Sequence, residues 1–312
     1  MLRLALPKVA ALLMAGVLSL VAGGCDLRGA LAKGQVDAVR EADTGIMQHW
    51  DPELAGLSLP YGIIQLESAV ELAPDYEPLM LTIIDAYVAY ATGWVREQAH
   101  AAEIAGQFDR AEHLNRRAGL MYDRALLFAK RMLRLRDRDF DEAVAGGLDA
   151  FKKWLDYHFF DKGEDSEVLL TAGTAWLATM IASEEGLAAA ADLPFARAVV
   201  ERSVELDPEL TGARGLSLLG TIECSVPKLA GGRPQVGLKL MQRAARSSER
   251  NNHLILVSMA EDCAVALQDR KLFHKLLMEV IEAGDVSKYR LSNKIARRRA
   301  GRLLAQMDEY FY

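Results

Sequence analysis

The stretch SVELDP at Ser203–Pro208 repeats, with two changes, the earlier stretch AVELAP at Ala69–Pro74. In each copy a small residue stands five positions before a proline. A small side chain lets a neighbouring helix approach closely, and a proline ends a helix because it lacks the backbone N–H. The recurrence therefore predicts a chain that repeats one unit of paired helices.

The residues after the second copy continue the pattern of a tetratricopeptide repeat. Leu219-Gly220 resembles the Leu-Gly pair of the first helix of such a repeat, and Gly237 and Ala244 resemble the small residues of the second helix. These repeats are about 34 residues long and stack into a solenoid. We therefore expect an all-α fold, a tetratricopeptide-like array of antiparallel helix pairs (an α-solenoid), which residues 194–247 match best. The helix pair expected over 77–135 is longer than an ordinary repeat and indicates a modified array.

Apolar residues recur with helical spacing along nearly the whole chain, and no stretch alternates apolar and polar residues as a strand would. The expected helices are 27–48, 57–73, 77–105, 109–135, 138–149, 151–158, 164–183, 194–206, 211–224, 234–247, 252–267, 270–282 and 287–310. We expect prolines to begin or end helices, and the candidates are Pro74, Pro78, Pro194, Pro208, Pro227 and Pro234. The short connections predict antiparallel packing of successive helices.

The first residues resemble a bacterial export signal. Arg3 and Lys8 precede an apolar run, Val9–Val21, which is short for a membrane span of roughly 20 residues. The run leads into Ala22-Gly23-Gly24-Cys25, which resembles a lipobox, the site where a cysteine is lipidated and the signal is cut off. Several acyl chains on Cys25 would make a stable membrane anchor. We therefore predict a signal peptide over 1–24, a lipidated N-terminal segment over 25–56 and a helical domain over 57–312.

The net charge bears on nucleic-acid binding, and the cysteine content bears on disulfide formation. Removal of residues 1–24 takes away two positive charges and moves the formal net charge from −6 to −8, which disfavours nucleic-acid binding. Cys224 and Cys263 would pair in an oxidising compartment or serve as small buried apolar residues. We favour the second interpretation, because no geometry can be derived from the sequence.

The sequence contains no recognisable catalytic, metal or cofactor motif. The histidines show no His-x-x-x-His or His-Glu-x-x-His spacing, and there is no Gly-rich phosphate loop or Gly-x-Ser-x-Gly turn. The run Arg297–Arg299 is expected to be a solvated side of a helix. We therefore expect no enzyme activity and no cofactor.

Aromatic residues offer the best candidates for a ligand cavity. Tyr87, Tyr90 and Trp94 have spacings of three and four, which place them on one face of the first long helix. Tyr122 is expected on the opposing long helix, and Trp154 and Trp176 on the helices that follow. Aromatic clusters in helical arrays line ligand cavities, although they more often form ordinary core. These six residues are our cavity candidates.

Four stretches of the chain carry a family resemblance through their order along the sequence. They are Asp85–Ala125, Thr171–Ile181, Ala191–Pro208 and Leu291–Phe311. Together they resemble the T-component (TatT) family associated with TRAP transporters over roughly residues 57–311. The resemblance implies a periplasm-facing lipoprotein with a degenerate tetratricopeptide-like fold. It also implies partnership with a TRAP-type periplasmic solute-binding protein and a role in delivering a ligand, with an apolar compound as candidate.

Two functional hypotheses follow. The first is an accessory of a TRAP-type solute transporter, anchored by lipid on the periplasmic side of the cell envelope, which binds a periplasmic solute-binding protein. The second is a tetratricopeptide-type scaffold lipoprotein for the assembly of an envelope or secretion complex. Inner or outer membrane, the identity of the ligand and the formation of a homo-oligomer are left open by the sequence.

Overall fold

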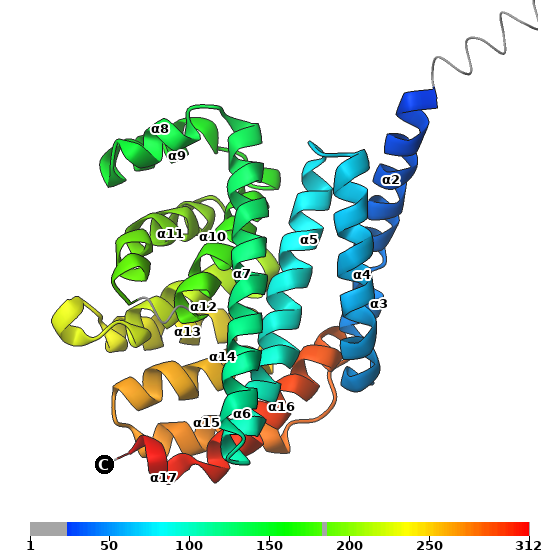
Figure 1. The fold of residues 1–312 in the computed structure, drawn as a ribbon. Coiled ribbons are helices and arrows are strands. Elements are labelled where there is room, and N and C mark those ends of the chain that lie inside the picture. The colour runs from blue at the N-terminus through cyan, green and yellow to red at the C-terminus, as the bar shows by residue number, and fades with distance from the viewer. Residues whose placement is uncertain (1–23, 183–185, 312) are drawn as a thin grey trace, which may run out of the picture.

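The computed structural model describes residues 24–182 and 186–311, and over these residues the chain is helical, with no strand. The expected all-α class is confirmed, whereas the solenoid arrangement stays a prediction. Figure 1 shows helices α8 to α15 stacked beside the long helix α7, while α5, α4 and α2 run alongside α7 on its other side. The predicted signal peptide lies outside the described residues except for Gly24.

The N-terminal part consists of α2 (Gly24–Glu41), α3 (Asp43–Met47) and α4 (Pro52–Leu72). Helix α4 begins five residues before the expected Leu57, because Asp51 caps it. The Oδ1 atom of Asp51 accepts hydrogen bonds from the backbone N–H groups of Glu53 (2.9 Å) and Leu54 (3.2 Å). Pro52 occupies the first helical position, where its missing N–H costs nothing.

Two long helices then form a hairpin, made of α5 (Glu77–Tyr90), a π-helical segment η1 (Ala91–Val95), α6 (Arg96–Ile104) and α7 (Phe108–Arg136). Gly106 makes the turn with a φ of +70°. The continuous segment Glu77–Ile104 is long and apolar enough to span a membrane, but half of its most apolar part is buried within the protein. The neighbouring helices account for that burial, which is typical of a core helix.

The middle of the chain contains α8 (Phe140–Ala145), α9 (Leu148–His158), α10 (Glu164–Ala182), α11 (Gly186–Leu206), α12 (Leu210–Ser225), the short 3-10 helix η2 (Lys228–Ala230) and α13 (Pro234–Ser247). Helices α12 and α13 touch at two glycines. A Cβ atom on Gly237 would lie 2.6 Å from the carbonyl oxygen of Gly220, and one on Gly220 would lie 2.9 Å from that of Gly237. Small residues therefore allow the close approach that their spacing suggested.

Ser203, the small residue of the opening stretch, lies between α11 and α10. Its buried hydroxyl donates a hydrogen bond to the backbone carbonyl of Ser166 (2.7 Å). On the same pair of helices, a Cβ atom on Gly173 would lie 2.4 Å from the Cγ2 atom of Val200. The small position thus permits close packing, and the hydroxyl adds a bond that alanine would lack.

The C-terminal part contains α14 (His253–Ser258), a second π-helical segment η3 (Met259–Ala264), α15 (Arg270–Glu282), the 3-10 helix η4 (Ser287–Tyr289), α16 (Arg290–Ala305) and α17 (Met307–Tyr310). The bounds expected for the helices over 234–247 and 270–282 agree with α13 and α15. The helix expected over 252–267 is interrupted by the π segment, and the one over 287–310 divides into three parts.

Pro194 does not begin a helix, which corrects the expectation for this residue. Helix α11 runs from Gly186 to Leu206 and contains Pro194 in its interior. Proline removes one hydrogen bond of a helix, so surrounding packing must compensate. The ring of Phe195 stacks on that of Trp176, with centroids 6.4 Å apart, and this contact holds the next turn against α10.

Cys224 and Cys263 form a disulfide, which corrects the preferred expectation of two separate thiols. The pair joins the end of α12 to η3 across 39 residues, and both cysteines are buried. Their Cα atoms are 4.9 Å apart. This distance depends on how α12 packs against η3, and spacing along the chain carries no information about it.

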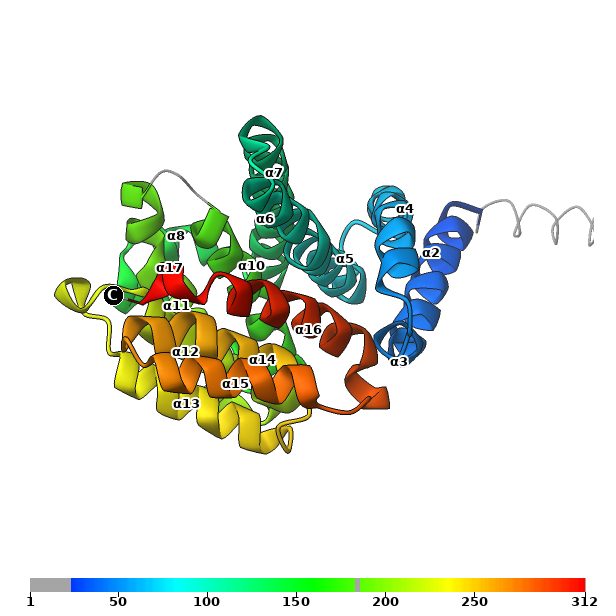
Figure 2. The same ribbon diagram turned by 90° about the horizontal axis from the view of Figure 1, so that it is seen from below.

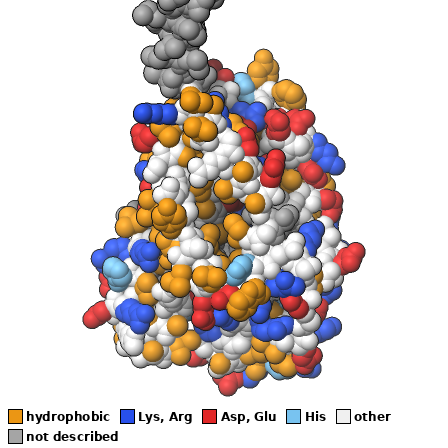
Figure 3. Space-filling view, turned by 90° about the vertical axis from the view of Figure 1, so that its right-hand side faces the viewer, with side chains coloured by type: hydrophobic (Ala, Val, Ile, Leu, Met, Phe, Trp, Pro, Cys, Tyr) orange, Lys and Arg blue, Asp and Glu red, His pale blue; other side chains and the backbone are white. Residues whose placement is uncertain are grey.

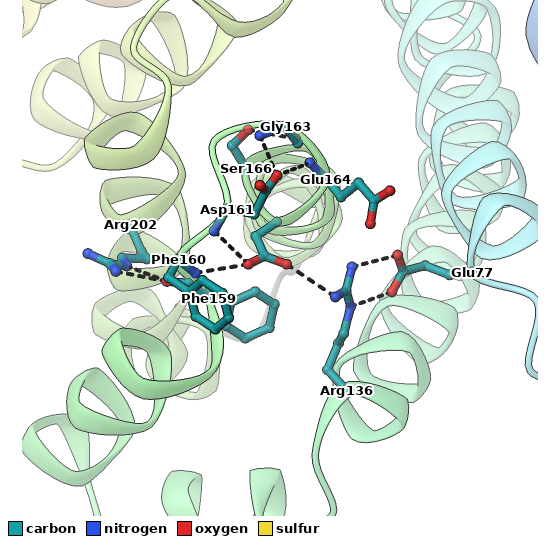
Figure 4. Close-up of polar contacts among 10 residues, drawn as sticks. Glu77, Arg136, Phe159, Phe160, Asp161, Gly163, Glu164, Ser166 and Arg202 are labelled. Carbon is teal, nitrogen blue, oxygen red and sulfur yellow. Dashed lines mark hydrogen bonds and ion pairs between the residues drawn. The ribbon is translucent and has the colours of Figure 1, made fainter.

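An ionic contact joins the long hairpin to the stacked helices (Figure 4). Arg136, the last residue of α7, binds both carboxylate oxygens of Glu77 on α5 (2.6 and 2.7 Å) and Oδ1 of Asp165 on α10 (3.1 Å). The other oxygen of Asp165 accepts hydrogen bonds from the backbone N–H groups of Phe160 and Asp161, each 2.9 Å long. The buried Asp165 is therefore fully bonded, and it fixes the position of α10 relative to the hairpin.

Candidate functional site

An open groove of about 1250 Å³ lies between the N-terminal end of α4, the segment from Tyr90 to Ile104, and helices α16 and α17. Figure 2, which views the molecule from below, shows α6, α4 and α16 around this region. We call it the groove. Its lining residues are Glu53, Gly56, Leu57, Tyr90, Gly93, Trp94, Glu97, Gln98, Ala101, Glu103, Ile104, Ile295, Arg298, Arg302, Ala305, Gln306 and Glu309.

Trp94 lies against α4 in the groove. Its indole N–H donates to the backbone carbonyl of Pro52 (2.8 Å), and Tyr90 stacks on its ring with centroids 6.1 Å apart. A Cβ atom on Gly56 would lie 2.3 Å from the indole ring, so only glycine permits this contact. Pro60, one turn later in α4, has no N–H to donate to the carbonyl of Gly56. The groove therefore combines a fixed aromatic pair with a backbone carbonyl outside the helical ladder.

A π-helical segment lies on each side of α16. The first, η1, carries Gly93, and a Cβ atom there would lie 3.5 Å from the Cδ1 atom of Ile295 on α16. The second, η3, carries Glu261, which forms an ion pair with Arg299 of α16. A π turn holds one more residue than an α turn, which changes the directions of the side chains that follow it, and such turns are frequent at functional sites.

Arginines of α16 connect the walls of the groove. Arg302 lies 3.3 Å from the carboxylate of Glu97 on α6, and its side chain is only 11% exposed. Arg298 lies 3.1 Å from the carboxylate of Glu53 on α4. Arg299 contacts Glu97 at 4.0 Å in addition to its pair with η3. The expected solvated side is confirmed for Arg297 and Arg298, which are exposed, whereas Arg299 is partly buried between acids of other helices.

Behind α16, Asp262 of η3 is in an unusual environment for a carboxyl group. Burial, followed by the negative charge of the adjacent Glu261, raises the pKa of Asp262 to about 7. The Oγ1 atom of Thr221 donates a hydrogen bond to its Oδ2 atom (2.9 Å). This carboxyl group does not line the groove, so we treat it as part of the support for α16 rather than as a binding group.

Exposed apolar side chains extend the groove along α4. Leu54, Leu57, Tyr61 and Ile64 are 52%, 79%, 68% and 59% exposed, and their spacings of three and four place them on one side of the helix. Leu57 also lines the groove. Figure 3 shows hydrophobic side chains gathered on the face of the molecule that carries α2 and α4. We call these four residues the α4 stripe.

The groove contains two of the six aromatic residues predicted for a cavity, Tyr90 and Trp94. Tyr87 does not line the groove; its ring stacks on Phe128 and its hydroxyl donates to Glu67 (2.9 Å). Burial and the Glu67 carboxylate raise the pKa of Tyr87 to about 12. Tyr122 is buried, and its hydroxyl lies 2.9 Å from that of Thr92.

Trp154 and Trp176 belong to an enclosed aromatic cluster, which we define as Phe140, Phe151, Trp154, Trp176 and Phe195. The indole N–H of Trp154 donates to Asp137 (3.2 Å), and that of Trp176 donates to Asp192 (2.8 Å). The cluster lies apart from the groove lining. A ligand-binding role for any of the six predicted residues stays a prediction.

Sequence reasoning missed fifteen of the seventeen lining residues, including all those on and next to α16 and α17. These helices contribute a third of the groove lining, Ile295, Arg298, Arg302, Ala305, Gln306 and Glu309. The C-terminal stretch was part of the family resemblance, but no pattern in it indicated a groove. Over residues 24–182 and 186–311, the structure contains no group of three or more His, Cys, Asp or Glu side chains arranged to hold a metal ion.

Comparisons with known proteins place the chain in a family. A search of curated proteins gave no match. A match to the family described as TRAP transporter T-component covers residues 48–311, which include the α4 stripe and the entire groove lining. The family is that of a transporter accessory component and is not a known enzyme family. This chain belongs to the TRAP transporter T-component family.

Proposed function

We propose that this T-component is a lipid-anchored accessory on the periplasmic side of the cell envelope, which docks a periplasmic solute-binding protein on the groove and the α4 stripe. The observation that carries the proposal is the continuity of these two surfaces through Leu57. Contiguous exposed apolar surface rimmed by polar side chains is typical of protein interaction sites. We call the groove and the stripe together the docking face.

Two features support a location outside the cytoplasm. The Val9–Val21 run before Cys25 resembles a lipoprotein export signal. The disulfide between Cys224 and Cys263 suits an oxidising compartment, since cytosolic proteins keep their thiols reduced. Metabolic labelling with a radioactive fatty acid tests the anchor. We expect label on the wild type and none on Cys25→Ala, and an unlabelled wild-type protein would contradict the anchor.

The docking proposal is tested with the solute-binding proteins of the TRAP-type transporters from the same organism. Full-length protein in detergent is immobilised, and the affinity of each solute-binding protein is measured by surface plasmon resonance. We expect Leu57→Asp and Tyr61→Asp each to weaken binding by at least about 10-fold, because both place a charge in the centre of the docking face.

Leu229→Asp is the matched control. Leu229 is fully exposed in the connection between α12 and α13, away from the docking face. We expect this variant to bind as the wild type does. Equal losses in all three variants, or no binding by the wild type, would contradict the docking proposal.

An apolar ligand is a second candidate occupant of the docking face. Trp94, Leu57 and Ile295 provide aromatic and aliphatic surface for it, and the buried Tyr90 stacks on the ring of Trp94. Mass spectrometry of small molecules retained by the purified protein tests this part. We expect a lipid-like compound that is retained by the wild type and lost from Trp94→Ala, and retention by both would place it elsewhere.

A further inference from the structure

We infer that the groove receives a cationic segment of the partner protein, in which an apolar side chain anchors against Trp94 and Lys or Arg side chains face Glu103 and Glu309. The inference rests on the proposed docking function and specifies its chemistry. It follows from which polar groups of the groove are already bonded within the protein and which are left for a guest.

Each arginine of the groove lining forms an ion pair with a glutamate of the lining. The lining holds two arginines, Arg298 and Arg302, against four glutamates. Arg298 is paired with Glu53 at 3.1 Å, and Arg302 is paired with Glu97 at 3.3 Å. These two pairs leave an excess of two carboxylates in the lining. The lining therefore carries a net negative charge, which disfavours an anionic guest.

Hydrogen-bond acceptors remain for a guest. Glu103 contacts the ring of His100 (3.1 Å) and the amide of Asn115 (3.2 Å), rather than a lysine or an arginine. Glu309 accepts a hydrogen bond from the amide of Gln306 (3.3 Å). Ammonium and guanidinium groups supply several donors each and match this set of acceptors.

The aromatic pair suits the same guest. The ring faces of tyrosine and tryptophan attract cations and also bury apolar side chains. The guanidinium of Arg117 already lies 5.8 Å over the ring of Tyr90. We therefore place the guest's cations at the Glu103 and Glu309 end of the groove and its apolar anchor against Trp94.

The size of the groove favours a polypeptide segment. At about 1250 Å³ it exceeds the range of roughly 300–1,000 Å³ that is usual for small-molecule sites. The groove is open to solvent, and the exposed Leu57 of the α4 stripe lines it, so a segment on the surface of a folded partner can enter it. An amphipathic helix in an apolar groove is a common form of such recognition.

The test uses two synthetic helical peptides as probes. Both carry leucines three and four residues apart, and one has lysines where the other has glutamates. Binding to the full-length protein is measured by isothermal titration calorimetry at low and high ionic strength. We expect the lysine peptide to bind about 10-fold more tightly at low salt, with the advantage reduced at high salt.

The double variant Glu103→Gln with Glu309→Gln should lose most of this preference. The matched control is Glu71→Gln with Glu282→Gln, two exposed glutamates outside the groove lining, which should keep the preference. Equal affinity for the two peptides, no binding of either, or a preference that survives in E103Q/E309Q would overturn the inference. Peptide binding that dissociates a dimer would assign the groove to a second copy of the chain and would also overturn it.

The inference and the docking proposal can fail separately. A solute-binding protein that binds the wild type and E103Q/E309Q equally would overturn the cationic segment and leave docking intact. A solute-binding protein that does not bind at all, together with the expected peptide preference, would contradict the docking proposal and retain the chemistry of the groove.

Discussion

Trp94 in the groove and Trp176 in the enclosed aromatic cluster make similar bonds in different surroundings. Each indole N–H donates to an oxygen 2.8 Å away, from Pro52 in one case and Asp192 in the other. Trp176 is 1% exposed, whereas Trp94 is only partly buried. The difference arises from the neighbours, since the rings of Phe151 and Phe195 contact Trp176, whereas Trp94 lines the open groove. The same residue type thus stabilises the fold in one region and offers a binding surface in the other.

The largest effect is expected from Trp176→Ala, which should lower the free energy of unfolding by about 3–5 kcal/mol because it leaves a cavity in a closed cluster. Trp94→Ala should cost less than half as much, because its ring is already in contact with solvent. Denaturant titration followed by circular dichroism measures both. An equal loss in the free energy of unfolding for the two variants would contradict the difference in burial between the aromatic cluster and the groove.

The disulfide should matter mainly on the groove side. Replacing Cys224 and Cys263 together by alanine should cost about 2–4 kcal/mol, since the bond closes a long loop in the unfolded chain. Hydrogen exchange should then increase in η3 and α16, which pack near the bond, and change little in α10 and α11. Increased exchange in the aromatic cluster instead would show that the two regions are not independent.

The carboxyl group of Asp262 should make stability depend on pH. Its pKa is about 7 in the folded protein and lower in the unfolded chain, so the folded state binds more protons between these values. Stability should therefore fall as pH rises from about 4 to 7, by an amount on the order of 1–2 kcal/mol, which allows for the partial exposure of the side chain. Denaturation midpoints over this range should flatten in Asp262→Asn, and an unchanged slope would contradict the assignment.

The smallest effect is expected from Trp94→Phe, which removes one hydrogen bond and keeps an aromatic ring in the groove. Loss of the bond to Pro52 should cost about 1 kcal/mol. Affinity for the lysine peptide should change less than about 3-fold, because the ring face remains. Thermal unfolding and calorimetry check the two parts, and a cost as large as that of Trp176→Ala would place Trp94 in the core.

Much of the fold could be predicted, because its signals are local. The helices over 234–247 and 270–282 have their predicted bounds, and the first begins at Pro234 as its sequence indicated. Pro194 was misjudged because tertiary packing of the next residue, Phe195, maintains the helix around it. Residue propensities near a proline favour a helix end, but tertiary packing of neighbouring side chains overrides them when it stabilises the helix by more than the proline costs.

The candidate site could be predicted only in part. The spacing of Tyr90 and Trp94 placed both on one face of a helix, and both line the groove. Tyr87 lies three residues before Tyr90 on the same side of the helix but packs on Phe128, because one side of a long helix contacts several neighbouring helices. Which neighbour a side chain meets depends on the arrangement of helices, and sequence spacing does not contain it.

From the sequence alone, the helical class, the order of most helices and the family resemblance were determined, because apolar periodicity, prolines and small residues act within a few residues of one another. Tertiary structure alone decided that Cys224 and Cys263 pair, that Trp176 is enclosed, and that Arg298 meets Glu53 across 245 residues of chain. Such contacts depend on the distance in space between remote segments. That distance is set by the packing of whole helices rather than by any local pattern.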